Sequence, residues 1–362
     1  METLDTWQWQ MANRITDISS LRNYVEISEQ QAGEIAAAGA RFRWAITPYY
    51  ASLMDRKDVN CPIRMQAIPS ILELQNYNGM QDPLQEETQS PTPGLIHRYP
   101  DRVALTVSSE CAMYCRHCTR KRFVGQPVQR TTWQAIQAGI DYVTKAESIR
   151  DVLITGGDPF VLSDDRLERI LRALRTIDHV EIIRFGTRTP CTMPQRITDQ
   201  LCDMLAKYHP IWVNTHFNHP RELTEEAAKA ADMLLRAGIP VGNQSVLLRG
   251  INDNLDTMKS LLHGLLKMRI RPYYLYQCDR IVGTEHFWTP LTTGLDLIDH
   301  LQGYTTGLAV PQFIVDSPMG KIPLNRSKLV ELTDDHAVLR NYEGQTMTIS
   351  CWVEPRLALL AI

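Results

Sequence analysis

Residues 103–118 read Val-Ala-Leu-Thr-Val-Ser-Ser-Glu-Cys-Ala-Met-Tyr-Cys-Arg-His-Cys and carry the strongest signal in the sequence. The first five residues form an apolar run that predicts a buried strand. Cys111, Cys115 and Cys118 follow it, spaced C-x3-C-x2-C. Three thiolates on one tight loop can converge on a four-iron cluster and leave one iron open for chemistry. The spacing alone also allows a zinc site lacking its fourth ligand, or buried thiols without metal.

Six further apolar runs follow along the chain, and helical patterns lie between most of them. The expected strands lie at 152–155, 181–186, 211–215, 239–248, 271–276 and 310–316. The expected helices lie at 131–146, 164–177, 225–238 and 254–268. Strands that alternate with amphipathic helices predict a parallel sheet in an α/β fold. About six such units fit an open or incomplete barrel and five would fit a doubly wound sheet, which periodicity alone does not separate.

The two flanking regions carry different patterns. Residues 1–95 are predicted to be mostly helical, because candidate N-caps such as Ser28 precede apolar positions at helical spacing. Within this region the polar, proline-bearing stretch 83–93 is predicted to be a linker. Residues 96–320 then hold the barrel. Residues 321–362 form a C-terminal extension, in which two alternating runs predict a β-hairpin before an apolar tail.

Composition excludes several classes of protein. The 362 residues are 44% hydrophobic and 22% charged, which is typical of a globular chain. A net charge of −3 argues against nucleic-acid binding through a general basic surface. No apolar run approaches the roughly 18 residues of a membrane helix, and no secretory signal is visible, so we expect a soluble cytoplasmic protein. Eight cysteines, three of them clustered, indicate metal binding rather than a disulfide scaffold.

Several motifs resemble those of one enzyme family. The cysteine motif matches that of radical S-adenosylmethionine (SAM) enzymes, and its surroundings are similar to the lysine 2,3-aminomutase family. The matching segments include HRYPDR (97–102), CRHCTRKR (115–122), TGGDP (155–159), THFNHPRE (215–222), NQSVLLRGIND (243–253) and CDRIVGTEHF (278–287). The resemblance extends from Trp7 to about Tyr342. It implies an isomerase with an incomplete (β/α)6 TIM-type barrel of the radical SAM class and a [4Fe–4S] cluster on the three cysteines.

The resemblance also assigns residues to SAM. In the family, the open iron chelates the amino and carboxylate groups of SAM, which is cleaved to a 5′-deoxyadenosyl radical. Gly156 and Gly157, after the second expected strand, would let the backbone approach the SAM amino group. Asp158 and Gln244 are assigned to cofactor binding as well. Without the cysteine motif, a Gly-Gly pair after a strand is as often a plain turn.

A second cofactor, pyridoxal phosphate (PLP), is implied by the same resemblance. Lys321, just after the last barrel strand, matches the Schiff-base lysine of the family, and a desolvated amine at a barrel mouth suits that role. Arg98 and Arg102 match the arginines that hold the PLP phosphate. Without the resemblance, all three would be interpreted as solvated surface charges. The glycine-rich run before the lysine is shorter than in the family, which alters the spacing between Asp316 and Lys321.

The substrate implied by the resemblance is a free cationic α-amino acid. Arg120 matches the clamp for the substrate α-carboxylate, while Asp279 and Asp316 match the pair that binds the distal ammonium of lysine. Paired carboxylates in a partly dry pocket require a cationic partner, and a glutamate-specific relative is not expected to keep both. L-Lysine, with its α-amino group moved to Cβ, is therefore the expected substrate. Arginine on the same scaffold, a lysine mutase associated with elongation factor P, and a non-catalytic iron–sulfur protein are the alternatives.

The resemblance also bears on partners and on a second metal. The zinc-binding cysteines of longer family members are absent, and Asn254 stands where one is expected, so we predict a short form without zinc. The cluster implies an electron donor such as flavodoxin or ferredoxin, and the family implies a homo-oligomer, either a dimer or a tetramer. No nucleic-acid or membrane partner is expected, because the basic run at 116–122 lies beside an anionic cluster and the anionic end of the substrate.

Overall fold

The computed structural model describes residues 6–75, 78–125, 131–333 and 335–350. Its centre is a sheet whose nine strands, counted over these residues, lie side by side in chain order. They are β1 (Leu95–Tyr99), β2 (Arg102–Ser108), β3 (Asp151–Gly156), β4 (Ile182–Gly186), β5 (Ile211–Thr215), β6 (Val241–Leu247), β7 (Arg271–Gln277), β8 (Gln312–Ser317) and β9 (Gly320–Leu324). Strands β2 to β8 are parallel, and β1 and β9 pair antiparallel at the edges.

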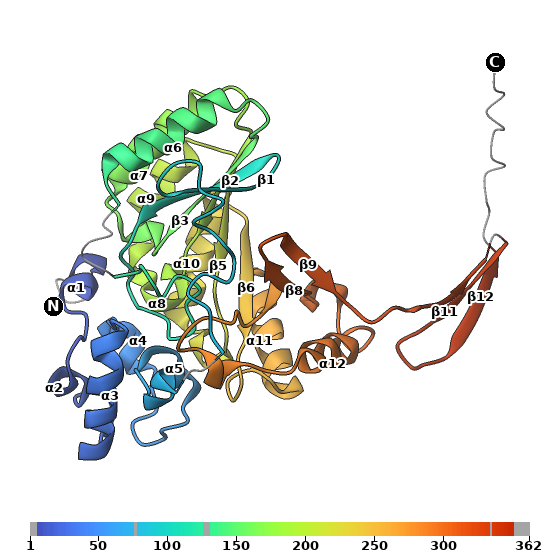
Figure 1. The fold of residues 1–362 in the computed structure, drawn as a ribbon, viewed down its shortest axis with the longest axis horizontal. Helices are drawn as coiled ribbons and strands as arrows, with labels where there is room; N and C mark the ends of the chain where they lie inside the picture. The colour runs from blue at the N-terminus through green and yellow to red at the C-terminus, as the bar shows by residue number, and fades with distance from the viewer. Residues whose placement is uncertain (1–5, 76–77, 126–130, 334, 351–362) are drawn as a thin grey trace.

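This strand order separates the two folds that the sequence left open. A doubly wound sheet reverses its strand order at a switch point, whereas here every strand neighbours the next one in the chain. The sheet therefore winds in one direction, as in a barrel (Figure 1). No pairing joins β1 to β9 in the described part of the chain, which confirms the predicted incomplete barrel. The predicted strands are all present, and the two antiparallel edge strands were not predicted.

Helices cover the outside of this sheet (Figure 1). They are α6 (Trp133–Lys145), α7 (Asp164–Arg175), α8 (Thr189–Thr192), α9 (Asp199–Ala206), α10 (Glu225–Arg236), α11 (Leu255–Lys267) and α12 (Leu291–Leu301). Each longer helix turns one apolar stripe inward; on α7 the buried residues are Leu167, Ile170, Leu171 and Leu174, at helical spacing. Asn254 accepts a hydrogen bond from the backbone of Thr257 and caps α11. No helix among the described residues is long and apolar enough to cross a membrane.

The N-terminal region is helical, as predicted. It contains α1 (Trp7–Ala12), α2 (Ile18–Leu21), α3 (Glu29–Arg41), α4 (Pro48–Ser52), α5 (Pro62–Ala67) and the short 3-10 helix η1 (Ile71–Leu74). Ser28 begins α3 with a capping box, because its side chain accepts from the Gln31 amide and the Gln31 side chain accepts from the Ser28 amide. The stretch 83–93 is not an open linker: it folds into turns that bury Leu84 and Glu86 against the barrel.

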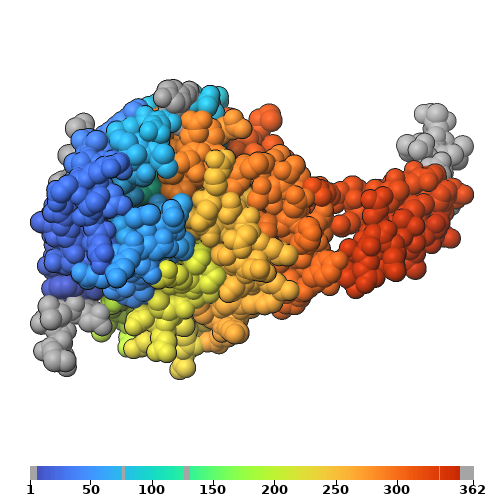
Figure 2. Space-filling view, turned by 90° about the horizontal axis from the view of Figure 1, so that it is seen from below, coloured from blue at the N-terminus to red at the C-terminus, as the bar shows by residue number. Residues whose placement is uncertain are grey.

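The C-terminal extension contains the predicted hairpin and one additional strand. Strands β10 (Leu329–Leu332), β11 (His336–Arg340) and β12 (Thr346–Ser350) form a separate antiparallel sheet. This sheet extends away from the barrel in both views (Figures 1 and 2). Its described contacts with the barrel include Tyr342, which packs edge-on against Tyr304, and Lys328, which pairs with Asp299. The predicted apolar tail at 357–362 lies outside the described residues.

Candidate active site

One cavity of about 740 Å³ occupies the interior of the barrel. Its wall includes every site residue that was predicted from the sequence: Arg98, Arg102, Cys111, Cys115, Cys118, Arg120, Gly156, Gly157, Asp158, Gln244, Asp279, Asp316 and Lys321. Several of these residues directly follow β2, β3 and β7 or lie in the β8–β9 hairpin, because parallel strands bring their carboxyl ends to one edge. The cavity continues to the amino end of β2, where Arg102 lies.

The cysteine loop is held from outside by the N-terminal helical region. The Arg14 guanidinium donates to the backbone carbonyl of Cys111 at 2.6 Å. The backbone amides of Tyr114 and Arg116 donate to the carbonyls of residues 45 and 66 at 3.1 and 2.9 Å. The Arg116 side chain and Lys121 share the buried carboxylate of Glu73. The loop is therefore fixed by the protein on the side that faces away from the cavity.

The three predicted metal-binding thiols are free and line the same wall. Burial raises the pKa of Cys111 well above its usual value and that of Cys118 to about 11, and neighbouring thiols add to both shifts. Without a metal the thiols of Cys111 and Cys118 are protonated at neutral pH, so metal binding to these two residues must release protons. Nδ1 of His117, between two of the cysteines, is buried without a hydrogen-bond partner among the described residues. Within those residues, no three His, Cys, Asp or Glu side chains are arranged to hold a single metal ion.

The two glycines after β3 have a different structural cause from the one expected. Gly156 has φ +138°, and a Cβ on it would lie 2.2 Å from the carbonyl oxygen of Ser108. A Cβ on Gly157 would lie 2.4 Å from the carbonyl oxygen of Glu110. The close approach that requires glycine is therefore to the backbone that leads into Cys111, rather than to a ligand. Both glycines still line the cavity, and their predicted contact with SAM stays a prediction.

Asp158 also has protein partners that the sequence did not reveal. Its carboxylate accepts from the Thr187 hydroxyl at 2.6 Å, from the Arg188 amide at 2.7 Å and from the Phe160 amide at 3.0 Å. Burial raises the pKa of Asp158, and these hydrogen bonds oppose that rise. The carboxylate thus fixes the loop after β4 against the loop after β3. The predicted contact between Asp158 and a cofactor remains a prediction. Both oxygens of the carboxylate already accept hydrogen bonds from the protein.

Arg120 is held by a residue that was not predicted. Its Nε and Nη2 donate to the carboxylate of Glu86, with the shortest distance 2.9 Å, and Nη1 donates to Thr155 Oγ1 and the Gly156 carbonyl. Burial lowers the pKa of Arg120, but the Glu86 charge raises it overall. Glu86 also pairs with Arg122. Glu73 and Glu86 therefore neutralise part of the basic run beside the cysteines, whereas these cations were expected from the sequence to balance the cluster and the substrate.

The two predicted substrate carboxylates lie in one cavity with different partners. Asp316, opposite Lys321 in the β8–β9 register, accepts from Lys321 Nζ at 3.1 Å and from Arg98 Nη1 at 2.9 Å. Asp279 accepts only the Thr119 hydroxyl, at 2.7 Å, and forms no ion pair with a described residue. Burial, and then the charge of Asp316, raises the pKa of Asp279 to about 6. Asp279 is thus a partly buried acid that forms no ion pair with a described residue, although the charge of Lys321 acts on it at longer range.

The two predicted phosphate-binding arginines differ in how many of their N–H groups already have protein partners. Arg98 also donates to the Gln89 side chain at 2.7 Å and to the Leu84 carbonyl at 3.0 Å. A phosphate would have to replace some of these partners. Arg102 donates to Asp101 at 2.9 Å and lies over the Tyr99 ring, 3.8 Å from its centre. Arg102 is the more available of the two guanidinium groups.

Comparison with known proteins identifies the family. The radical SAM superfamily model matches residues 105–262, and the lysine-2,3-aminomutase model matches 298–359. An L-lysine 2,3-aminomutase of Fusobacterium nucleatum is 50% identical over 357 residues, which is 98% of this chain and 83% of that protein. One from Clostridium subterminale is 50% identical over 347 residues, 95% of this chain and 83% of that protein. This chain belongs to the lysine 2,3-aminomutase family of radical SAM enzymes. A glutamate 2,3-aminomutase of Clostridioides difficile is also 46% identical over 348 residues, 96% of this chain and 82% of that protein.

Membership of the lysine 2,3-aminomutase family makes the chain an isomerase and implies a [4Fe–4S] cluster and SAM. The site fits the cluster: three free, half-buried cysteines from one loop line a cavity that has room for a further ligand.

Three site residues of this aminomutase were missed by the sequence analysis. Glu86 lies in the stretch predicted as a linker, where nothing in the pattern marks one acid among several. Arg188 and Glu222, which lie behind Cys115, belong to segments at the ends of β4 and β5. Their positions directly after parallel strands were a signal that could have identified them.

The contact between the β3 glycines and the cysteine loop yields a first prediction. Because a Cβ at residue 157 would meet backbone rather than a flexible side chain, we expect Gly157→Ala to destabilise the protein by about 1–3 kcal/mol. We also expect it to reduce the iron bound after anaerobic reconstitution by at least about half. Gly33→Ala is the control, because a Cβ on Gly33 of α3 meets nothing within 4 Å and should stabilise that helix by about 0.5–1 kcal/mol. Equal iron content in both variants would contradict the conclusion that the close approach at Gly157 supports the cysteine loop.

Proposed function

We propose that this chain is a PLP-dependent radical SAM 2,3-aminomutase that acts on free L-lysine. The single observation that carries the choice of substrate is Asp279, a partly buried carboxylate that lines the cavity and forms no ion pair with a described residue, while the charge of Lys321 acts on it only at longer range. A charged group in such surroundings is stable only when an opposite charge joins it. A lysine side chain supplies that charge, whereas a glutamate side chain would add a second negative charge. The names of the two lysine mutases at 50% identity agree with this choice.

Arg120, on the wall of the same cavity, suits the α-carboxylate of the substrate. Arg120 lines the cavity, and its guanidinium is held in one orientation by Glu86, Thr155 and the Gly156 carbonyl. A pre-oriented guanidinium binds a carboxylate with less loss of entropy than a free one. Holding the substrate at both ends limits which C–H bond faces the radical source, and this is how binding energy serves such a reaction. SAM and the cluster would supply the radical when they are bound.

Lys321 is the candidate for PLP attachment. PLP, when bound, supplies an aldehyde that captures an amine and a ring that spreads an unpaired electron. Lys321 Nζ lies in the cavity with Asp316, and its side chain is about one third exposed, at 31%. Arg98, Arg102 and Tyr99 line the same cavity and offer phosphate donors. Lys321 would hold the cofactor, and Asp316, which accepts from Lys321 Nζ at 3.1 Å, lies beside that amine.

A competition assay tests this proposal directly. The reconstituted protein is incubated anaerobically with SAM, dithionite, PLP and equal amounts of lysine, arginine and glutamate, with no protein partner present. We expect β-lysine as the main product, formed only when SAM and reductant are both present. β-Arginine or β-glutamate as the main product would overturn the choice of substrate. Absence of any product from free amino acids, with the cluster intact, would overturn the proposed activity.

A further inference from the structure

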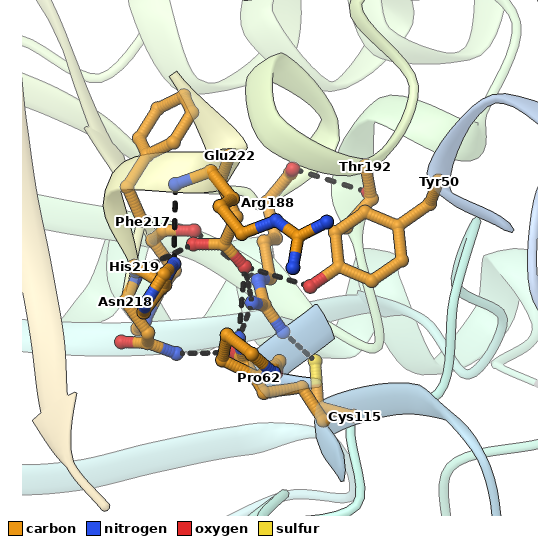
Figure 3. Close-up of polar contacts among 12 residues, drawn as sticks. Tyr50, Pro62, Cys115, Arg188, Thr192, Phe217, Asn218, His219 and Glu222 are labelled. Carbon is orange, nitrogen blue, oxygen red and sulfur yellow. Dashed lines mark hydrogen bonds and ion pairs between the residues drawn. The ribbon is translucent and has the colours of Figure 1, made fainter. Parts of the chain in front are cut away.

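The loop after β4 carries an arginine that touches a cysteine of the cluster motif. Nη1 of Arg188 donates to Sγ of Cys115 at 2.8 Å, and the arginine side chain is buried (Figure 3). We propose that Arg188 is a positioning residue that raises the reduction potential of the cluster through this N–H···S contact. The proposal rests on the cluster, which family membership implies, and is independent of PLP and of the substrate.

The remaining donors of Arg188 leave its side chain little freedom. Nε donates to the His216 carbonyl at 3.1 Å, and Nη2 donates to Gln66 Oε1 at 2.7 Å and to Glu222 Oε1 at 2.8 Å. Its backbone amide is bound to Asp158. Because Nε and Nη2 are held by these partners and the guanidinium is planar, the direction in which Nη1 points is fixed. That direction is toward Cys115 and therefore toward the group that the cysteine holds.

Glu222 keeps this guanidinium in place from behind. Its side chain is fully buried, and Oε1 also accepts from the Tyr50 hydroxyl at 2.7 Å and from Gln66 Nε2 at 3.1 Å. Oε2 accepts from the backbone amides of Asn218 at 2.5 Å and His219 at 3.0 Å. Figure 3 shows these groups converging on the carboxylate. The network joins α4 and α5 to the ends of β4 and β5, so the orientation of Arg188 is set by elements that are far apart in the chain.

The charges of this network determine the sign of the expected effect. One-electron reduction adds a negative charge to the cluster, and both a hydrogen bond to a ligating sulfur and a nearby positive charge stabilise that charge. Arg188 contacts the sulfur directly, whereas Glu222 contacts only the far side of the guanidinium. The positive charge is therefore nearer to the cluster than the negative one. Removal of Arg188 should lower the potential, and removal of the Glu222 charge should raise it.

Redox titrations followed by electron paramagnetic resonance test this inference on the reconstituted protein without SAM, PLP or substrate. Dithionite supplies the electron. In Arg188→Gln we expect at least a tenfold lower ratio of reduced to oxidised cluster at a fixed potential, which is a shift of about 59 mV for a one-electron couple. Arg188→Lys keeps the positive charge but loses the planar guanidinium, so its midpoint potential should shift less than that of Arg188→Gln. Glu222→Gln should shift the midpoint in the opposite, positive direction.

Arg196 provides the matched control. It is a buried arginine that pairs with Asp164 and binds two backbone carbonyls, and within the described residues no hydrogen bond joins it to Cys111, Cys115 or Cys118. Arg196→Gln and Arg196→Lys should therefore cost stability without moving the midpoint of the cluster. An unchanged midpoint in Arg188→Gln would overturn the proposal. If the Arg188 variants fail to bind iron, the midpoint potential of Glu222→Gln decides. A positive shift of that potential supports the proposal, and a negative or absent shift overturns it.

Discussion

Lys321→Ala is expected to abolish both PLP binding and turnover while leaving the iron content of the reconstituted protein unchanged. Among the described residues, two lysines line the cavity, Lys321 and Lys121. The amine of Lys121 is bound to Glu73 and to two backbone carbonyls. No other amine is therefore placed to form the bond with PLP. The measurements are the visible absorption band of lysine-bound PLP, the yield of β-amino acid and the iron content.

Lys328→Ala is the control for this substitution. Lys328 pairs with Asp299 outside the cavity, so its loss should change neither PLP binding nor turnover. Retention of the lysine-bound PLP band in Lys321→Ala would show that another amine holds the cofactor. Full turnover without that band would show that the reaction does not need this lysine. Either result would contradict the role given to Lys321.

Asp279→Asn is expected to reduce kcat/KM for lysine by about 100-fold or more, because removal of one partner from a buried ion pair costs about 3–5 kcal/mol. For norleucine, which has no distal charge, the same substitution should have little effect. The two substrates compared on the two proteins form a cycle that isolates the charge interaction. Asp203→Asn, at an exposed position on α9, is the control. Equal losses for lysine and norleucine would show that Asp279 does not recognise the distal ammonium.

The pH dependence of the same comparison provides a second measurement. The pKa of Asp279 is raised to about 6 in the substrate-free protein, so the carboxyl is neutral below that pH and charged above it. The kcat/KM for lysine should therefore fall as the pH decreases through 6, while that for norleucine should not follow this profile. Because the raised pKa means that the fold disfavours the charged form, Asp279→Asn should also stabilise the substrate-free protein at pH 8, by about 3 kcal/mol at most.

Much of the barrel was predictable because its signals are local. The apolar run of each parallel strand and the amphipathic pattern of each long helix are properties of neighbouring residues. The edge strands β1 and β9 were not predicted, because their residues are half-exposed and lack a continuous apolar run. The third strand of the C-terminal sheet was missed for the same reason, since β10 is exposed along its length.

The candidate site was predictable where a motif carried it. The three cysteines, Arg120 and Lys321 lie in segments that match the family, and all of them line one cavity. Glu86 had no such signal, because it becomes important only when its turn packs against Arg120. The close approach of the β3 glycines to the backbone of Ser108 and Glu110 was not predicted, since only the β2–β3 pairing shows which backbone lies beside them. Their predicted contact with SAM stays a prediction.

Residue types and their spacing along the chain were enough to indicate an α/β fold, the cluster motif and the resemblance to the family, because these depend on short segments. The strand order that distinguishes a barrel from a doubly wound sheet came from the structure. Which charges neutralise one another was settled only in three dimensions. Asp316 pairs with Lys321 and Arg98 while Asp279 forms no ion pair with a described residue, and Cys115 accepts a hydrogen bond from Arg188 in the loop after β4. The physical reason is that the free energy of a buried charge depends on its neighbours in space, which come from segments far apart in the chain.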